Sequence, residues 1–405
     1  MTRKCLTIGT KLSQQKTMKP HRNLARLTFL GVLSLATIIS FSAASSATTG
    51  NIVKSDLTGN WLITLRGTTG CGFSSMQANV TLGSTGTGTA TLQMHGQCGD
   101  STATGQTFTI NTLASDGSGT AGLSCGPACG WNFDIQVSPD RSKFNLVDVS
   151  SENPGNYLEG VAILASSSGD IVTSDLTGSW QLTLYSLGGC GIASTMVTFT
   201  LDPSGVSTNA AETSHTAGCG DSSSTGNNFT VLSMNANGSG TANLTCGTDC
   251  GFNFNIQVSP DRSTFNLVDL TNGGNYLAGV AINNSTAGKI VDTNVAGKWK
   301  VAIYGQGGCG IASSLVTFTL SAKGVATNAA ETSHSAGCGD STSSGNTFTV
   351  TSLNADGSGT ANLTCGTACG FNYNIQVSPD RSTFNLVDVS TANPGNFQIG
   401  TAIHQ

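Results

Sequence analysis

Cysteines are the residues whose number and spacing most clearly indicate chemistry in this sequence. Apart from Cys5, they fall into three groups of four with nearly the same internal spacing. The groups are Cys71, Cys98, Cys125 and Cys129; Cys190, Cys219, Cys246 and Cys250; and Cys309, Cys338, Cys365 and Cys369. In an exported chain, four cysteines per group predict two disulfides per group, for which the sequence alone allows three pairings.

The same sulfur atoms are candidate zinc ligands, because the last two cysteines of each group have a Cys-x-x-x-Cys spacing. The first two cysteines stand singly, 27 residues apart in the first group and 29 in the others. An oxidising compartment converts such thiols to disulfides. We therefore predict disulfides rather than a four-thiolate zinc site, and we predict no metal or other cofactor.

Histidines and carboxylates near the second cysteine of two groups are the other candidates for chemistry. They are His215 with Glu212 and Asp221, and His334 with Glu331 and Asp340. Such sets can bind a metal or transfer protons. In the first copy, however, His95 is displaced by one residue relative to its cysteine, and no glutamate stands at the matching place. We therefore interpret these residues as exposed loop side chains and predict no catalytic residue.

A Ser-Pro-Asp-Arg-Ser segment also recurs in each copy, at residues 138–142, 259–263 and 378–382. Proline in the second position is typical of a turn, and the adjacent aspartate and arginine predict a local ion pair. A binding role for this segment is the alternative.

Repetition organises the whole chain and sets the elements that position these side chains. Trp61, Trp180 and Trp299 are each 119 residues apart, and the other motifs follow them in the same order. Solenoid repeats run to about 20–50 residues, so a repeat of this length predicts a complete domain. The predicted domains are residues 51–169, 170–288 and 289–405.

Residues 1–47 have the organisation of a secretory signal peptide, with Met18 as the expected true start. Seven basic residues and no acid are combined with an apolar run at 27–39, which small residues follow. The run is shorter than the ~20 residues of a spanning helix, so we expect no membrane span in the mature chain. We therefore expect a secreted, periplasmic or cell-surface protein.

Charge argues against one class of partner. Removing the leader leaves 10 basic residues against 22 acidic ones, a net charge of about −12. A field of this sign repels phosphate backbones, so we expect no nucleic-acid partner.

Alternation of apolar and polar residues predicts an all-β fold. The first copy contains eight runs of this kind, at 60–66, 74–82, 87–95, 106–113, 118–124, 130–137, 142–149 and 156–164. Short links between them predict three tandem antiparallel up-and-down barrels, with β-sandwiches as the alternative. In such a barrel the links after the first, third and fifth strands lie at one end, so the four cysteines of a copy are expected at one rim. The simplest pairing joins the first cysteine to the second and the third to the fourth, while crossed pairings stay open.

A Gly-x-Trp motif opens the first predicted strand of each copy. It reads Gly59-Asn60-Trp61, Gly178-Ser179-Trp180 and Gly297-Lys298-Trp299. This motif at the start of an eight-stranded domain resembles the lipocalin and avidin group of barrels. The resemblance implies that each tryptophan plugs one end of a barrel and that the interior can hold a small ligand.

Three functions are therefore considered. The first is a structural or interaction module of the surface or adhesion type, with a surface or protein partner. The second is the binding of a small apolar ligand inside the barrels, where an empty pocket favours binding and a packed interior favours the first function. The third, a hydrolase or metal-dependent enzyme, requires His215 and Glu212 to converge, and we do not predict an enzyme.

Overall fold

The computed structural model describes residues 50–126, 129–152, 154–246, 250–271, 273–284, 289–365, 369–390 and 395–405. These residues all belong to one compact unit, residues 45–405. Cys5 and the predicted signal peptide lie outside the described residues. Within the described ranges, no helix has the length and apolar character that a membrane crossing requires.

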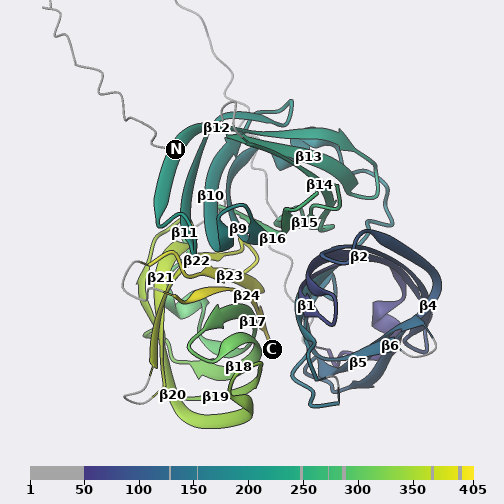
Figure 1. The fold of residues 1–405 in the computed structure, drawn as a ribbon, viewed down its shortest axis with the longest axis vertical. Coiled ribbons are helices and arrows are strands. Elements are labelled where there is room, and N and C mark those ends of the chain that lie inside the picture. Colours follow the sequence, from purple (N-terminus) through teal and green to yellow (C-terminus); the bar gives the residue numbers. More distant parts are fainter. Residues whose placement is uncertain are drawn as a thin grey trace, which may run out of the picture. The chain divides into compact units, whose positions relative to one another are not determined.

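Each copy of the repeat folds into a closed antiparallel barrel of eight strands, with consecutive strands hydrogen-bonded and the last paired to the first (Figure 1). Barrel 1 consists of β1 (Gly59–Thr69), β2 (Gly72–Leu82), β3 (Thr87–Gly96), β4 (Ser101–Leu113), β5 (Ser118–Gly126), β6 (Cys129–Val137), β7 (Lys143–Val147) and β8 (Tyr157–Leu164). The predicted fold class is confirmed, and the sandwich alternative is wrong.

The other two barrels repeat this order. Barrel 2 consists of β9 (Gly178–Gly188), β10 (Gly191–Leu201), β11 (Val206–Thr216), β12 (Ser222–Met234), β13 (Ser239–Cys246), β14 (Cys250–Val258), β15 (Thr264–Val268) and β16 (Tyr276–Asn283). Barrel 3 consists of β17 (Gly297–Gly307), β18 (Gly310–Leu320), β19 (Val325–Ser335), β20 (Gly339–Leu353), β21 (Ser358–Cys365), β22 (Cys369–Val377), β23 (Thr383–Val387) and β24 (Phe397–His404).

The strand bounds differ most from the prediction at β4. The alternating run indicated a start near residue 106, whereas the strand begins at Ser101. Residues 101–105 are small and polar and lie mostly exposed, so they carry no apolar periodicity. Backbone pairing with β3 nevertheless extends the strand through them.

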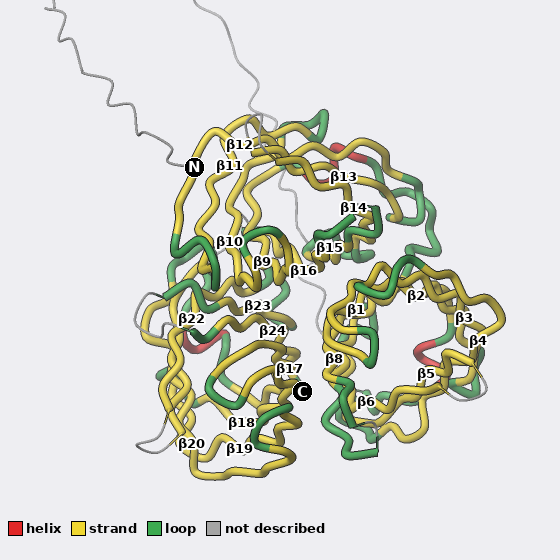
Figure 2. Tube along the Cα trace, viewed as in Figure 1, coloured by secondary structure: helices red, strands yellow, loops and turns green. Residues whose placement is uncertain are grey.

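A tryptophan and a short 3-10 helix lie together at the start of each barrel. The helices are η1 (Lys54–Leu57), η2 (Thr173–Leu176) and η3 (Asp292–Asn294), drawn red in Figure 2. The buried indole of Trp61 donates a hydrogen bond of 2.8 Å to the carbonyl of Leu57, and Trp180 and Trp299 do the same with Leu176 and Val295. Each indole is therefore buried without leaving its N–H unsatisfied.

Apolar side chains from alternate strand positions fill the interior of barrel 1. The buried residues include all eight that look bulky enough in the sequence to fill it, namely Trp61, Ile63, Leu65, Phe108, Ile110, Phe133, Ile135 and Val137. Because successive side chains of a strand face opposite sides, the intervening residues face outward, where the barrels contact one another.

One asparagine per barrel docks that barrel on another. Its side-chain amide donates to two backbone carbonyls, which is how a polar group becomes buried at low cost. The contacts run from Asn266 to Leu62 and Val161, from Asn385 to Gln181 and Val280, and from Asn145 to Lys300 and Thr401. Barrel 2 thus contacts barrel 1, barrel 3 contacts barrel 2 and barrel 1 contacts barrel 3, so the three interfaces close a ring.

A serine in each barrel follows the same cycle. Its hydroxyl donates to the carbonyl of an aspartate in another barrel, and the pairs are Ser75 with Asp269, Ser194 with Asp388, and Ser313 with Asp148. The interface is therefore built three times from the same residues.

Candidate functional site

One disulfide closes the same end of every barrel. Cys71 is joined to Cys98, Cys190 to Cys219 and Cys309 to Cys338, with Cα atoms 5.3, 5.2 and 5.2 Å apart. Each bond ties the β1–β2 turn, or its equivalent, to the link after the third strand. These six sulfur atoms are bonded in pairs, which is the simplest of the pairings that the sequence allows.

The third cysteine is also disulfide-bonded in the second and third copies, at Cys246 and Cys365, while the second disulfide of the first copy stays a prediction. Cys246 stands opposite Cys250 across the β13–β14 hairpin, and Cys365 stands opposite Cys369 across β21–β22. The side chains of Cys125, Cys129, Cys250 and Cys369 lie outside the described residues.

The three histidines are buried, so their interpretation as exposed loop residues is wrong. His95, His215 and His334 lie on β3, β11 and β19 and are 3–5% exposed. The Nδ1 atoms pair with Asp100, Asp221 and Asp340, respectively. Each ring also packs on an aromatic ring of another barrel, Tyr276, Phe397 or Tyr157, with centroids 4.6–4.8 Å apart. The outward strand face is buried here because the barrels contact one another, which single-domain reasoning does not anticipate.

The structure does not bring the histidines and glutamates together. On β11, Glu212 lines the barrel interior, whereas His215 is an odd number of positions away and contacts Phe397 of barrel 3. Glu331 and His334 are separated in the same way on β19. The candidate metal or acid–base set, which we did not predict, is therefore not brought together by His215 and Glu212 or by His334 and Glu331.

The Ser-Pro-Asp-Arg-Ser segments form turns, and in two of them the arginine forms an ion pair with an aspartate outside the turn. Arg141 contacts Asp56 at 3.4 Å, and Arg262 contacts Asp175 at 3.1 Å, next to the first strand of the same barrel. The aspartate of each turn instead accepts hydrogen bonds from the two serines, as Asp261 does from Ser259 and Ser263.

These turn aspartates meet in a cluster that spans all three barrels. The carboxylates of Asp140, Asp261 and Asp380 lie within 4.8 Å of one another. The Nζ atom of Lys143 lies 3.9, 3.0 and 3.4 Å from them, respectively. Burial alone lowers the pKa of Lys143, but the carboxylates outweigh it and hold that pKa above its usual range. The lysine ammonium therefore takes the position that a cation would need.

Barrel 1 contains a second charged group that the other barrels lack. Arg66 faces Glu159 across β1 and β8, 2.5 Å apart, and both side chains are at most 2% exposed. The same register positions hold Tyr185 with Ala278 in barrel 2 and Tyr304 with Ile399 in barrel 3. Burial lowers the pKa of Arg66 and raises that of Glu159 to about 7, against the attraction between them.

Barrels 2 and 3 are hollow at the cysteine rim. We call these cavities mouth pocket 2, about 590 Å³, and mouth pocket 3, about 500 Å³. Mouth pocket 2 is lined by Leu184, Cys190, Thr195, Glu212, Ser214, Cys219, Leu244, Cys246, Phe252 and Leu277, among others. Mouth pocket 3 is lined by Ile303, Cys309, Ser314, Glu331, Ser333, Cys338, Leu363, Cys365, Phe371, Tyr373 and Gln398, among others. In the second and third copies, three cysteines line one cavity, as expected for a common rim.

Each mouth pocket contains one carboxylate. Glu212 and Glu331 are half-buried, and burial raises the pKa of both. A hydrogen bond with Ser314 opposes this shift at Glu331, and the amide of Asn227 lies 3.4 Å from Glu212. Among the described residues that line the two pockets there is no lysine, arginine or histidine.

The matching end of barrel 1 is filled by large side chains. In the strand register, Met76 and Met94 replace Thr195 and Ser214, and Leu92 replaces Glu212. Met76 and Leu92 are buried in the core, and Met94 packs against it. Sequence analysis missed this difference, although aligning the three copies on their tryptophans places Met76 against Thr195 and Ser314 and would have shown it.

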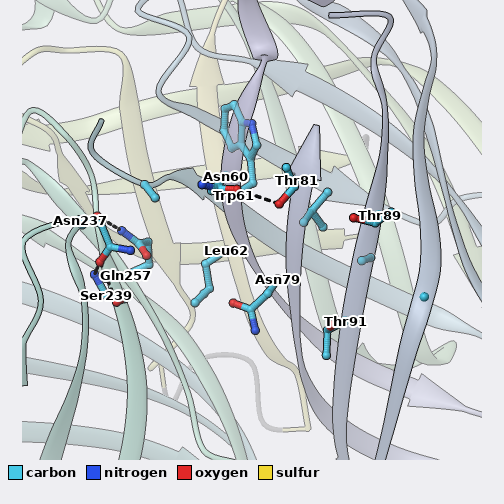
Figure 3. Close-up of a pocket in the computed structure, with 14 residues that line it drawn as sticks. Asn60, Trp61, Leu62, Asn79, Thr81, Thr89, Thr91, Asn237, Ser239 and Gln257 are labelled. Atoms are coloured by element: carbon cyan, nitrogen blue, oxygen red, sulfur yellow. Dashed lines mark hydrogen bonds between the residues drawn. The ribbon is translucent and has the colours of Figure 1, made fainter. Parts of the chain in front are cut away.

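A further groove of about 420 Å³ is lined by residues of barrel 1 and by Asn237, Ser239 and Gln257 of barrel 2 (Figure 3). Its polar side chains already bond to one another: Thr81 donates to Asn60, Ser239 donates to Asn237, and the Gln257 amide donates to the Asn237 carbonyl. Because these three polar pairs are already hydrogen-bonded, this groove is a weaker candidate than the mouth pockets.

No family model matches the chain, and no curated protein matches it. Among solved structures, it is similar to transferrin-binding protein B from Neisseria meningitidis, at a TM-score of 0.24 and 11% identity over 86% of this chain and 77% of that one. The same protein from Haemophilus parasuis gives 0.26 and 8%, over 85% and 76%. A Nostoc punctiforme protein of unknown function from the DUF3598 family gives 0.19 and 12%, over 57% and 97%. Likenesses at these scores assign neither a family nor a function, so the site rests on the geometry above.

Proposed function

We propose that the protein is an exported binding protein whose second and third barrels each take a small ligand through the mouth at the cysteine rim. The observation that carries this proposal is the pair of mouth pockets, about 590 and 500 Å³. Ligand pockets in proteins measure roughly 300–1,000 Å³ and combine apolar walls with a few polar groups. Both cavities have that size and that mixed lining.

The surroundings of the pockets support binding by a preformed site. A disulfide fixes the rim of each, and the ring of interfaces fixes each barrel against two others. A site that is already rigid loses less conformational entropy when a ligand binds, so more of the interaction free energy contributes to affinity.

The disulfides support a place outside the cytoplasm, because such bonds persist in oxidising compartments. This agrees with a secreted, periplasmic or cell-surface protein led by the predicted signal peptide.

A structural or interaction role is the second candidate, and the filled interior of barrel 1 favours it for that barrel. Barrel 1 also supplies Lys143, which joins the turns of all three barrels. We therefore assign barrel 1 to the scaffold and barrels 2 and 3 to ligand binding.

The test fills both mouth pockets on the pattern of barrel 1. Thr195→Met with Ser214→Met closes pocket 2, and Ser314→Met with Ser333→Met closes pocket 3. Each pair removes two hydroxyls that bond to each other, and in pocket 3 the hydrogen bond between Ser314 and Glu331 is lost as well. Octanol binding to the full chain is then measured by calorimetry and should be lost.

The matched control places the same residue on the exposed face of the same strands, as Thr208→Met with Thr327→Met, and should bind as the unaltered chain does. Equal octanol binding by the filled variant and the control, with both folded by circular dichroism, would contradict the proposal.

A further inference from the structure

The carboxylates of Glu212 and Glu331 are the features of the mouth pockets that packing does not explain. The barrel fold does not require them, because barrel 1 has Leu92 at the same register position. Both recur at the same place in the two hollow barrels. Each of the two acids therefore lines a cavity, whereas Leu92 stands beside Met76 and Met94 at the matching place in the described part of barrel 1.

The negative charge of these carboxylates determines which ligand groups can bind beside them. Neither forms an ion pair with a described residue, and the described lining of each pocket holds no cationic side chain. Water in an open cavity can solvate an unpaired carboxylate, but a ligand that displaces this water must replace its hydrogen bonds. A ligand with a negative or apolar group at this point would leave the carboxylate unpaired and desolvated.

Two neighbouring hydroxyls in each pocket already bond to each other. The hydroxyls of Thr195 and Ser214 bond to each other, and those of Ser314 and Ser333 do so at 2.8 Å. The apolar part of the walls includes Leu244 and Phe252 in one pocket and Leu363 and Phe371 in the other, beside further uncharged polar residues such as Asn275 and Gln398. The pocket thus offers one anionic group beside apolar surface.

We infer that the mouth pockets take small amphipathic amines, with the ligand ammonium paired to Glu212 in barrel 2 and to Glu331 in barrel 3. This inference rests on the proposed ligand-binding function and names the ligand class for it. The ammonium forms charge-assisted hydrogen bonds with the carboxylate, and the alkyl body covers the leucine and phenylalanine walls. Aromatic faces beside the site also favour a cation.

The test compares three probes of equal length, octylamine, octanol and octanoate, by calorimetry on the full chain at neutral pH. Octylamine should bind at two sites, octanol roughly ten- to a hundred-fold more weakly, and octanoate more weakly still. Glu212→Gln or Glu331→Gln alone should reduce octylamine binding to one tight site. The double variant should lower octylamine affinity roughly ten-fold or more while leaving octanol binding unchanged.

Glu152→Gln, at an exposed glutamate of barrel 1, is the matched control and should leave all three affinities unchanged. Octylamine binding unchanged in the double variant, or octanoate binding as tight as that of octylamine, would overturn the inference. The methionine-filled variant tests the proposed function independently of the ligand class. If that variant still binds octanol, the pockets are not the binding sites. If filling abolishes octanol binding but the Glu→Gln changes have no effect, ligand binding stands and amine recognition fails.

Discussion

Barrel 1 and barrel 2 share strand order, cysteine rim and inter-barrel contacts, yet one is filled at the rim and the other is hollow. The difference lies in three inward positions. Barrel 1 has Met76, Leu92 and Met94 where barrel 2 has Thr195, Glu212 and Ser214. Barrel 3 follows barrel 2, which shows that the hollow form is not an accident of one copy. The comparison teaches that the fold provides a cavity position, and that side-chain volume there decides whether a site exists.

Exchanging these residues should produce the largest effect. Met76→Thr, Leu92→Glu and Met94→Ser together give barrel 1 the pocket residues of barrel 2. The two methionine truncations should cost about 2 kcal/mol or more each in the free energy of unfolding. Calorimetry with octylamine should then find three sites rather than two.

Met76→Leu, which nearly conserves volume, is the control for this exchange and should change neither stability much nor stoichiometry. A folded triple variant that still shows two sites would mean that cavity and carboxylate are insufficient to make the site.

The buried ion pair of barrel 1 provides the next comparison. Glu159→Ala leaves Arg66 buried and unpaired, so the free energy of unfolding measured with urea should fall by about 3–5 kcal/mol. Arg66→Tyr with Glu159→Ile reproduces the pair found in barrel 3 and should be neutral or stabilising. A loss in the double variant as large as in the single one would show that barrel 1 depends on the charges themselves.

Lys143 should have a smaller effect, because its carboxylate partners are partly exposed. Lys143→Thr, which places the residue of barrels 2 and 3 in barrel 1, leaves three carboxylates without their cation. We expect a loss of about 1–3 kcal/mol at pH 7, and calcium should restore part of it.

The loss in Lys143→Thr should disappear on acidification. Lys143 holds the pKa of Asp261 below its usual range, so the stability from this pair is present above the unfolded pKa and lost as pH falls through the folded one. The free energies of unfolding of the two proteins should therefore begin to converge as the pH falls below about 4, and they should meet only below the folded pKa. Lys298→Thr, at an exposed site, is the control, and a deficit independent of pH would contradict the ion-pair account.

The smallest expected effect is a change in how the free energy of unfolding depends on pH. Burial raises the pKa of Glu159 from 4.5 to about 7, so ionisation costs stability as pH rises between these values. The difference in stability between the unaltered chain and the Arg66→Tyr, Glu159→Ile variant should change by at most about 1.4 kcal/mol per pH unit there. Parallel curves from pH 4.5 to 7 would show that Glu159 does not titrate in this range.

The fold could be predicted from the sequence because its signals are local. Alternation along β6 and turn residues between the strands indicate eight strands, and the position of Cys71 between the first two indicates the rim. The site was less accessible, because it depends on volumes that several strands leave unfilled. The roles of His95 and Asp140 could not be predicted, since both follow from barrel–barrel contacts between residues more than 100 positions apart.

The ring of asparagine contacts has a consequence for chain length. Asn145, Asn266 and Asn385 each reach a different barrel, so every described docking face is matched inside one molecule and assembly stops at three units. A chain that lost one repeat would carry one unmatched donor face and one unmatched acceptor face at its two ends. Such a molecule could join others head to tail, so that the ring would close between molecules instead of within one.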